Sequence, residues 1–231
     1  MMNTETINFT TSKGATTAIV ARPDGEASAA AILIHEWWGI NDHIRDLAAR
    51  YAKEGYLCVA PDLFRGKVTK DPEEASRLMH DLETADGLET IGEAIKKTRK
   101  ELGAQRIGIT GYCMGGTYAL RAACEISELA AAAPFYGDIP EERVLAKLKV
   151  PTIFFAGTRD KWINPEKVEV LKQAAIKYSL PLEAVSYDAD HAFFNDTRRE
   201  VYDPNAAKDA WQRVLAHFRK YMGQAARPTG A

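Results

Sequence analysis

Cys113 lies in the segment GYCMG (residues 111–115), which has the form G-x-C-x-G. A strand-like run at residues 106–110 precedes this segment, and a helical pattern at residues 115–126 follows it. Glycine two residues to either side allows a tight, strained turn in which strand and helix pack closely. Such a turn exposes the thiol at the carboxyl edge of a sheet, where the positive end of the following helix favours the reactive thiolate. Cys113 is therefore predicted to be a nucleophile. Cys58 and Cys124, inside a strand and a helix, are predicted to be core residues.

A thiol nucleophile needs a general base, and the base needs a group that orients it. His191 follows the last predicted strand, in the loop DADHAFFND, and Asp160 follows the preceding strand. We expect both at the edge of the sheet that carries the thiol, with His191 as the base and Asp160 as its orienting acid. Asp188 and Asp190 compete for the acid role, but close neighbours of a histidine in a turn rarely point at its ring.

The remaining histidines indicate no second centre. His43, His80 and His217 fall within predicted amphipathic helices, where an exposed or hydrogen-bonded histidine is the simpler interpretation. His35 and Glu36 invite a metal site, but HEWWG lacks the second histidine of H-E-x-x-H. The glycines around the cysteine do not form a phosphate loop, because neither G-K-[ST] nor G-x-G-x-x-G is present. We therefore expect no metal and no cofactor.

Short apolar runs alternate with longer helical patterns along the chain. The predicted strands are residues 7–11, 16–22, 30–35, 56–60, 106–110, 129–135, 150–156 and 182–187. The predicted helices are residues 43–54, 71–102, 115–126, 165–178 and 203–221, and Asp71 and Asn164, each followed by a proline, are the expected N-caps of the second and fourth. Gly87 and Gly92 are expected to break or bend the longest of them. This alternation indicates an α/β fold in which helices cover both faces of a mostly parallel sheet.

The composition is that of an ordinary globular protein, with 46% hydrophobic and 27% charged residues among 231. No repeat or linker is visible, so a single α/β domain is predicted over residues 1–222, followed by a disordered tail at residues 223–231. A net charge of −2 and scattered basic residues give no reason to expect nucleic acid or a membrane surface as partner.

No targeting signal is visible in the sequence. Three cysteines are too few for a disulfide framework and favour a reducing compartment. The polar amino terminus has no apolar signal region, and no stretch is long and apolar enough to cross a membrane. We expect a cytoplasmic protein, and the sequence indicates no oligomeric state.

Together these motifs resemble the dienelactone hydrolase family (carboxymethylenebutenolidases), which has the α/β-hydrolase fold. The resemblance covers nearly the whole chain. It rests on HEWWG at residues 35–39, PDL at 61–63, GYCMGG at 111–116, GTRD at 157–160 and DHAF at 190–193. The order nucleophile, acid, histidine is the order that this fold requires. Cysteine in the nucleophile turn distinguishes the family from the many serine hydrolases of the same fold.

The resemblance implies further roles around the thiol. Glu36 has the position of the family's activating glutamate, whose carboxylate can hold the thiol as S–H and take its proton when substrate displaces it. The alternative is a surface acid at a strand end. The backbone N–H groups of Trp37 and Met114 would form the oxyanion hole. The candidates for an apolar pocket, each of which could equally be a core residue, are Trp37, Trp38, Tyr136 and Phe193.

The implied reaction is hydrolysis of a small-molecule ester or lactone through attack by Cys113 and a thioester intermediate. The alternatives are a broader carboxylesterase or thioesterase, and a non-catalytic scaffold that binds a small molecule.

The substrate pocket departs from the family pattern at one position. The best-known members hold a substrate carboxylate with arginines, one of them four residues after the catalytic histidine, where this chain has Asn195. Asparagine carries no charge, so a substrate without a carboxylate at that point is predicted. Arg77 could be the second arginine, although a solvated helix position is favoured for it, and Arg198 or Arg199 could substitute.

Overall fold

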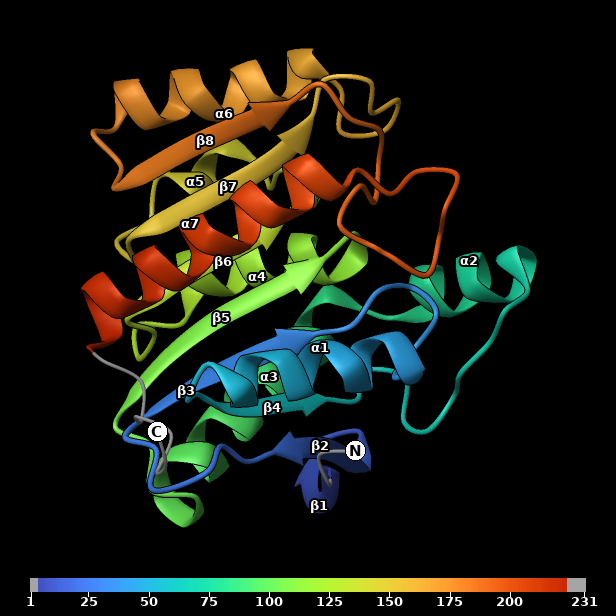
Figure 1. Cartoon of the computed structure of the whole chain (residues 1–231), viewed down its shortest axis with the longest axis vertical. Coiled ribbons are helices and arrows are strands. Elements are labelled where there is room, and N and C mark those ends of the chain that lie inside the picture. The colour runs from blue at the N-terminus through green and yellow to red at the C-terminus, as the bar shows by residue number, and fades with distance from the viewer. Residues whose placement is uncertain (1–3, 224–231) are drawn as a thin grey trace. The chain divides into compact units, whose positions relative to one another are not determined.

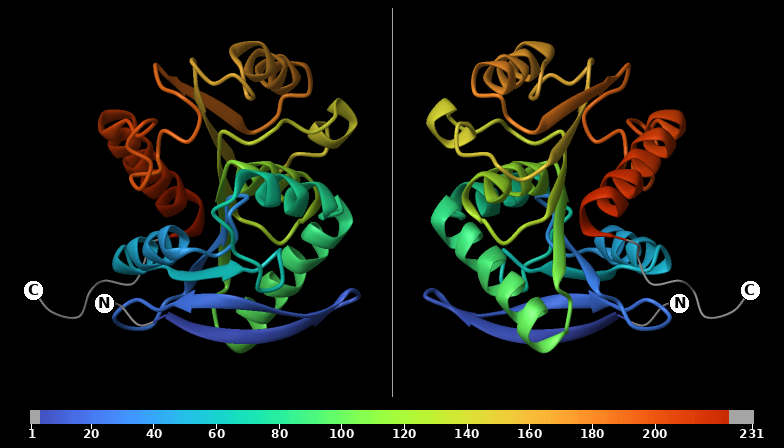
Figure 2. Two further views of the ribbon diagram at one scale, coloured as in Figure 1. Left: turned by 90° about the vertical axis from the view of Figure 1, so that its right-hand side faces the viewer. Right: turned by 90° about the vertical axis from the view of Figure 1, so that its left-hand side faces the viewer.

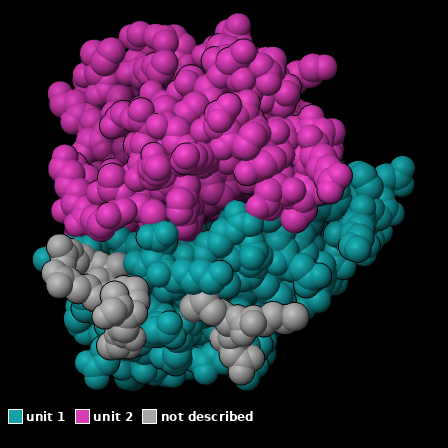
Figure 3. All heavy atoms as spheres, in the orientation of Figure 1, with its two compact units in different colours: residues 1–108, 222–231 teal, residues 109–221 magenta. Residues whose placement is uncertain are grey.

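The structure is a computed structural model that describes residues 4–223 (Figure 1). Within that range it contains eight strands and seven helices, and from β3 onward strands alternate with helices as predicted. The chain divides into two compact units (Figure 3). The first comprises the described residues up to Gly108 together with those from Met222 onward, and the second comprises Ile109–Tyr221. The single domain over residues 1–222 stays a prediction. Apart from Gly223, the predicted tail lies outside the described residues. None of the helices that the structure describes is long and apolar enough to cross a membrane.

The first unit holds four strands in the order β1-β2-β4-β3. Their bounds are Thr4–Thr11 for β1, Gly14–Ala21 for β2, Ala29–Ile34 for β3 and Leu57–Pro61 for β4. β1 pairs with β2 and β2 with β4 in antiparallel fashion, whereas β3 and β4 are parallel. The hairpin turns at Gly14, whose φ of 108° is accessible to glycine at little cost. All residues of β3 and β4 are buried, as their continuous apolar runs predicted.

Three helices accompany these strands. Their bounds are Asp42–Lys53 for α1, Pro72–Asp81 for α2 and Thr84–Glu101 for α3. α1 packs on β2 and β4 through apolar residues that recur at helical spacing, among them Ile44, Leu47 and Tyr51. Asp71 caps α2 by accepting the N–H of Glu73 at 2.9 Å, ahead of a proline at the first position, as predicted.

The long predicted helix at residues 71–102 is in fact two helices, and the predicted position of the break is wrong. α2 and α3 are separated at Leu82 and Glu83, which have extended backbone with ψ of 101° and 137°. Gly87 and Gly92 lie inside α3, where the N–H of Gly87 donates to the carbonyl of Glu83 at 3.1 Å and closes the first turn. A glycine lowers helix propensity by only about 1 kcal/mol, so the packing of a helix can outweigh it.

The second unit holds the strands in the order β5-β6-β7-β8. The strand bounds are Arg106–Tyr112 for β5, which starts just before the unit, Ala131–Phe135 for β6, Thr152–Gly157 for β7 and Leu182–Tyr187 for β8. The helix bounds are Met114–Glu125 for α4, Glu142–Leu145 for α5, Pro165–Lys177 for α6 and Pro204–Met222 for α7. The short α5 was not predicted. Figure 2 shows α7 on one face of the strands and α4 and α5 on the other.

The strands of this unit bring several loops to one edge. β6, β7 and β8 run parallel, and β5 lies next to β6. β6 and β7 are buried along their whole length, as expected of strands in a sheet that helices cover on both faces. The segments that follow β5, β6, β7 and β8 therefore meet at the carboxyl edge, where open α/β sheets bind ligands.

Candidate active site

Cys113 occupies a strained turn between β5 and α4. Its backbone has φ 56° and ψ −118°, a region that residues with a side chain avoid at a cost of about 1–3 kcal/mol. The strand ends at Tyr112 and the helix begins at Met114, so the cysteine alone makes the turn. Its N–H donates to the carbonyl of Phe135 at 3.2 Å, which ties the turn to β6. The side chain is partly exposed, whereas Cys58 and Cys124 are buried as predicted.

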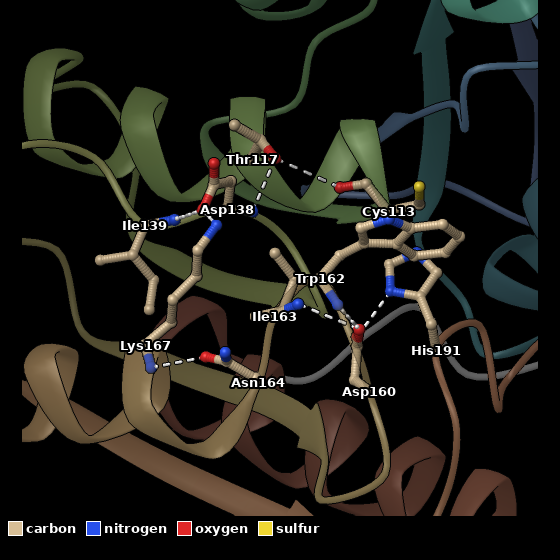
Figure 4. Close-up of polar contacts among 10 residues, drawn as sticks. All are labelled: Cys113, Thr117, Asp138, Ile139, Asp160, Trp162, Ile163, Asn164, Lys167 and His191. Atoms are coloured by element: carbon tan, nitrogen blue, oxygen red, sulfur yellow. Dashed lines mark hydrogen bonds and ion pairs between the residues drawn. The ribbon is translucent and has the colours of Figure 1, made fainter.

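Two glycines allow the backbone behind the turn to pack at contact distance. A Cβ on Gly116 would lie 2.1 Å from the carbonyl oxygen of Phe135, and one on Gly137 would lie 2.1 Å from the carbonyl carbon of Gly116. The hydroxyl of Thr117 accepts the N–H of Asp138 at 2.7 Å, and Figure 4 shows it beside the start of α4. The first turn of α4 is therefore fixed against the segment after β6.

Asp160 and His191 form a short hydrogen-bonded pair, with 2.6 Å between Oδ2 of the acid and Nδ1 of the ring (Figure 4). The other oxygen, Oδ1, accepts the N–H groups of Trp162 and Ile163 at 2.8 and 3.0 Å. Burial by itself raises the pKa of Asp160, which is 3% exposed. The pKa of Asp160 is nevertheless below its usual value. The hydrogen bond from His191, the charge of that ring when protonated and the two backbone N–H donors stabilise the carboxylate by more than burial destabilises it.

The free edge of the His191 ring is suited to proton transfer. Nε2 is buried and has no hydrogen-bond partner among the described residues, while Nδ1 is held by the acid. Figure 4 shows Cys113 on the side of the ring opposite to Asp160. Two aromatic rings flank the imidazole, those of Tyr136 and Trp162, each with its centroid 5.0 Å away.

The competing acids Asp188 and Asp190 are bound elsewhere. Arg159 lies 2.6 Å from Asp188 and 3.3 Å from Asp190, so it spans the two loops beside the Asp160–His191 pair. The backbones also meet here, because the N–H of Arg159 donates to the carbonyl of Ala189 at 3.0 Å. Both carboxylates therefore help to hold the loops together. Arg159 was not assigned a role from the sequence, although its place next to an acid and two residues after a strand was a usable signal.

The predicted pocket residues of the second unit lie mostly in the core. Phe193 is fully buried, and Tyr136 is 1% exposed with a positive φ of 35°. Asn195 is 2% exposed, and its Oδ1 accepts the N–H and hydroxyl of Thr197 at 3.1 and 2.6 Å. Of these three, Tyr136 is in ring contact with His191. A role for any of them in substrate binding stays a prediction.

Glu36, Trp37 and Trp38 belong to the first unit. Glu36 is 2% exposed, so the alternative of a surface acid is wrong. Its carbonyl accepts a hydrogen bond from Nδ1–H of His35 at 2.6 Å, and Nε2 of that ring accepts the N–H of Leu63 at 3.1 Å. Burial lowers the pKa of His35, which suits a neutral ring that both donates and accepts. The tryptophan rings pack edge to face with centroids 4.9 Å apart, and the roles predicted for these three residues stay predictions.

The second unit also has a cavity of about 380 Å³ away from these residues. It lies at the amino-terminal ends of β7 and β8, against α7, and its lining includes Thr152, Leu182 and Arg213. This is the edge opposite to Asp160 and His191, so the cavity holds none of the proposed catalytic groups. No cluster of three or more potential metal ligands occurs in the described part of the chain.

Comparisons with known proteins show which family the chain resembles over most of its length. The model of the dienelactone hydrolase family matches residues 16–222. "Protein usf" of Aquifex pyrophilus is 33% identical over 202 residues, which are 83% of this chain and 87% of that protein. A relative in Aquifex aeolicus, provisionally named a carboxymethylenebutenolidase, is 30% identical over 85% of this chain and 90% of its own length. A crystal structure from Klebsiella pneumoniae, provisionally described as a dienelactone hydrolase, superposes with a TM-score of 0.85 at 31% identity, covering 95% and 100% of the two chains.

Proposed function

Because the chain belongs to the dienelactone hydrolase family, with the α/β-hydrolase fold, we propose that it hydrolyses small esters or lactones with Cys113 as nucleophile. One observation carries the proposal. A histidine is held by a buried acid at 2.6 Å, its second ring nitrogen has no partner among the described residues, and a cysteine stands on a strained turn at the same sheet edge. This is the relation of base, orienting group and nucleophile that acyl transfer requires.

In the first step the thiol proton passes to Glu36 as substrate enters, and the Cys113 sulfur attacks the carbonyl carbon. The N–H groups of Met114 and Trp37 bind the oxyanion that forms. The tetrahedral intermediate collapses to a thioester, and the proton passes from Glu36 to Nε2 of His191, which delivers it to the leaving oxygen. For a lactone, the leaving oxygen stays attached to the acyl group.

In the second step His191 removes a proton from water at Nε2, and the resulting hydroxide attacks the thioester carbonyl. Asp160 stabilises the imidazolium that forms and keeps Nδ1 protonated throughout. Collapse releases the carboxylic acid and the thiolate, and the imidazolium returns its proton. No metal or cofactor enters the reaction, whose sum is ester plus water giving acid plus alcohol.

The substrate that fits best has no carboxylate near Asn195. The amide of this residue is buried and its oxygen is occupied by Thr197, so it offers no charged pair to an anion. Two of the three candidate arginines are paired with surface acids, since Arg77 lies 3.8 Å from Glu74 and Arg198 lies 2.8 Å from Glu200. A missing charged hydrogen bond costs about 1.5–3 kcal/mol, or about one to two decades in kcat/KM. A lactone bearing the carboxylate should therefore react no faster than its methyl ester, and a tenfold preference for the free acid would contradict this.

The experiment that tests the proposal is trapping of the thioester. Purified protein is screened with lactones and simple alkyl esters, quenched in acid, and digested for mass spectrometry of the peptide that carries Cys113. We expect turnover, and a peptide mass increased by that of the acyl group. Cys113→Ala should abolish both while keeping its far-ultraviolet circular dichroism. Turnover that survives in this variant, or acylation at another residue, would contradict the proposal. Binding without turnover would favour the non-catalytic scaffold.

A further inference from the structure

Trp162 combines two properties that rarely coincide. It is a large apolar residue that is 65% exposed, and its indole packs edge to face on the ring of His191, with centroids 5.0 Å apart and planes at 87°. The other aromatic ring in contact with His191, that of Tyr136, is 1% exposed. A ring buried on one side and open to water on the other offers apolar surface to a ligand.

The turn after Asp160 determines this placement. The N–H groups of Trp162 and Ile163 both donate to Oδ1 of Asp160, so the two residues are held by the acid that orients the histidine. Ile163 is 5% exposed and packs inward, which leaves Trp162 as the outward-facing residue of the pair. In Figure 4 its indole extends from the loop toward the ring of His191. The hydrogen bonds of the turn therefore fix the backbone from which the indole extends, and the edge-to-face contact with His191 places the ring itself.

The role proposed for His191 determines which portion of an ester, alcohol or acyl, lies beside Trp162. In the proposed mechanism water enters beside Nε2 of His191 to attack the thioester. The two tetrahedral intermediates differ only in whether the departing alcohol or the entering water occupies that place, so the alcohol leaves from the same side. A residue packed on His191 thus borders the alcohol portion of an ester rather than its acyl portion.

We propose that Trp162 is the specificity-determining residue of the leaving-group site and selects esters whose alcohol portion is flat and apolar. This inference rests on the proposed function, because it assumes that His191 activates water. Aromatic contacts of this kind are offset or edge to face and strengthen binding beyond the area they bury. The indole is attached to a turn fixed by hydrogen bonds, so little conformational freedom is lost when substrate binds.

Matched esters separate the alcohol side from the acyl side. Benzyl acetate and ethyl acetate share the acyl group, whereas ethyl phenylacetate places the ring on the acyl side. Trp162→Ala should lower kcat/KM for benzyl acetate by about tenfold, mainly through KM, and change the other two by less than about twofold. Trp162→Phe should recover most of the loss. Val170→Ala, an equally exposed apolar position on α6 at 59%, should change none of the three.

The outcomes distinguish this inference from the function on which it rests. Equal losses for all three esters would mean that Trp162 only supports His191, and a selective loss for ethyl phenylacetate would place it on the acyl side. Either result overturns the inference and leaves the hydrolase proposal intact. Wild-type protein that forms no thioester with any of the esters overturns both. Because Trp162 is exposed, unchanged thermal unfolding is expected of Trp162→Ala and verifies that the variant is folded.

Discussion

Replacing Asp160 with asparagine tests the orientation of the proposed base. In the wild type, Oδ1 of this residue accepts two backbone N–H groups at 2.8 and 3.0 Å, and Oδ2 faces Nδ1 of His191 at 2.6 Å. The amide introduced by Asp160→Asn has a single oxygen, which must stay with the two N–H groups. Its NH2 group then faces the ring and requires Nδ1 to be the acceptor, so the ring proton moves to Nε2. In that tautomer Nε2 cannot take a proton from water.

The magnitude follows from the hydrogen bond between the acid and the ring. Relative to the wild type, the variant lacks the hydrogen bond between the ring and a charged group, about 1.5–3 kcal/mol, and its active tautomer leaves two donors facing each other, about 1–3 kcal/mol more. The sum is about 2.5–6 kcal/mol, which corresponds to about two to four decades in kcat. The Asp160 side chain is fully buried and that of His191 is 12% exposed, so solvent screening reduces this loss little.

Two measurements check this expectation. Steady-state hydrolysis of a simple ester gives kcat, and nitrogen NMR of the His191 ring in a Cys113→Ala background reports which nitrogen carries the proton. The matched control is Asp188→Asn, which neutralises a nearby acid whose side chain is 84% exposed. The kcat of this variant should stay within about twofold of the wild-type value. A loss of less than tenfold in Asp160→Asn, or an unchanged tautomer, would refute the reasoning.

Three further predictions concern other parts of the molecule. Gly116→Ala places a Cβ 2.1 Å from a carbonyl oxygen and should lower the free energy of unfolding by about 3 kcal/mol or more. Gly92→Ala, at a helix position where the new Cβ meets no atom of the described residues within 4 Å beyond its own stretch of helix, should raise the free energy of unfolding by about 0.5–1 kcal/mol. Urea unfolding measures the two variants, and a change of the opposite sign in either would count against the packing described. Burial raises the pKa of Cys58, and that of Cys124 to about 12, so peptide mapping after brief iodoacetamide treatment at pH 7.5 should find neither modified in the folded protein. Burial also lowers the pKa of His35, so the folded protein resists protonation of this ring more than the unfolded chain does. The free energy of unfolding therefore keeps its full value above the unfolded-state pKa of about 6.5 and decreases as the pH falls below it. Urea unfolding at pH 7 and pH 5 should therefore show a smaller loss of stability in His35→Asn than in the wild type, and equal losses would contradict it.

The parts of the fold that the sequence predicts are those with a strong local pattern. β3 and β4 are continuous apolar runs, and both are buried along their full length. The capping residues Asp71 and Asn164 mark the first turns of α2 and α6, each followed by a proline. The turn at Cys113 was predictable because a nucleophile flanked by glycines between a strand and a helix is compatible with few other local structures.

The features that escaped prediction depend on interactions between distant segments. The break at Leu82 has no glycine or proline to indicate it, and both flanking helices have good helix formers. The four-residue α5 is too short to have a periodic pattern. The exposure of Trp162 depends on which of two adjacent apolar residues turns inward, and the hydrogen bonds to Asp160 decide that only in the folded chain.

The pairing of Asp160 rather than Asp190 with His191 shows how charge and backbone geometry select between candidate acids. Arg159 neutralises Asp190, and its own N–H donates to the carbonyl of Ala189, so the two loops are joined beside the Asp160–His191 pair. A Cβ on Gly157 would lie 2.3 Å from that same carbonyl oxygen. The close approach therefore requires glycine at the end of β7. The arginine keeps a second carboxylate from competing for the ring, while the buried acid alone orients it. The segment GTRD thus supplies, in four residues, the close backbone contact, the neutralising cation and the orienting acid.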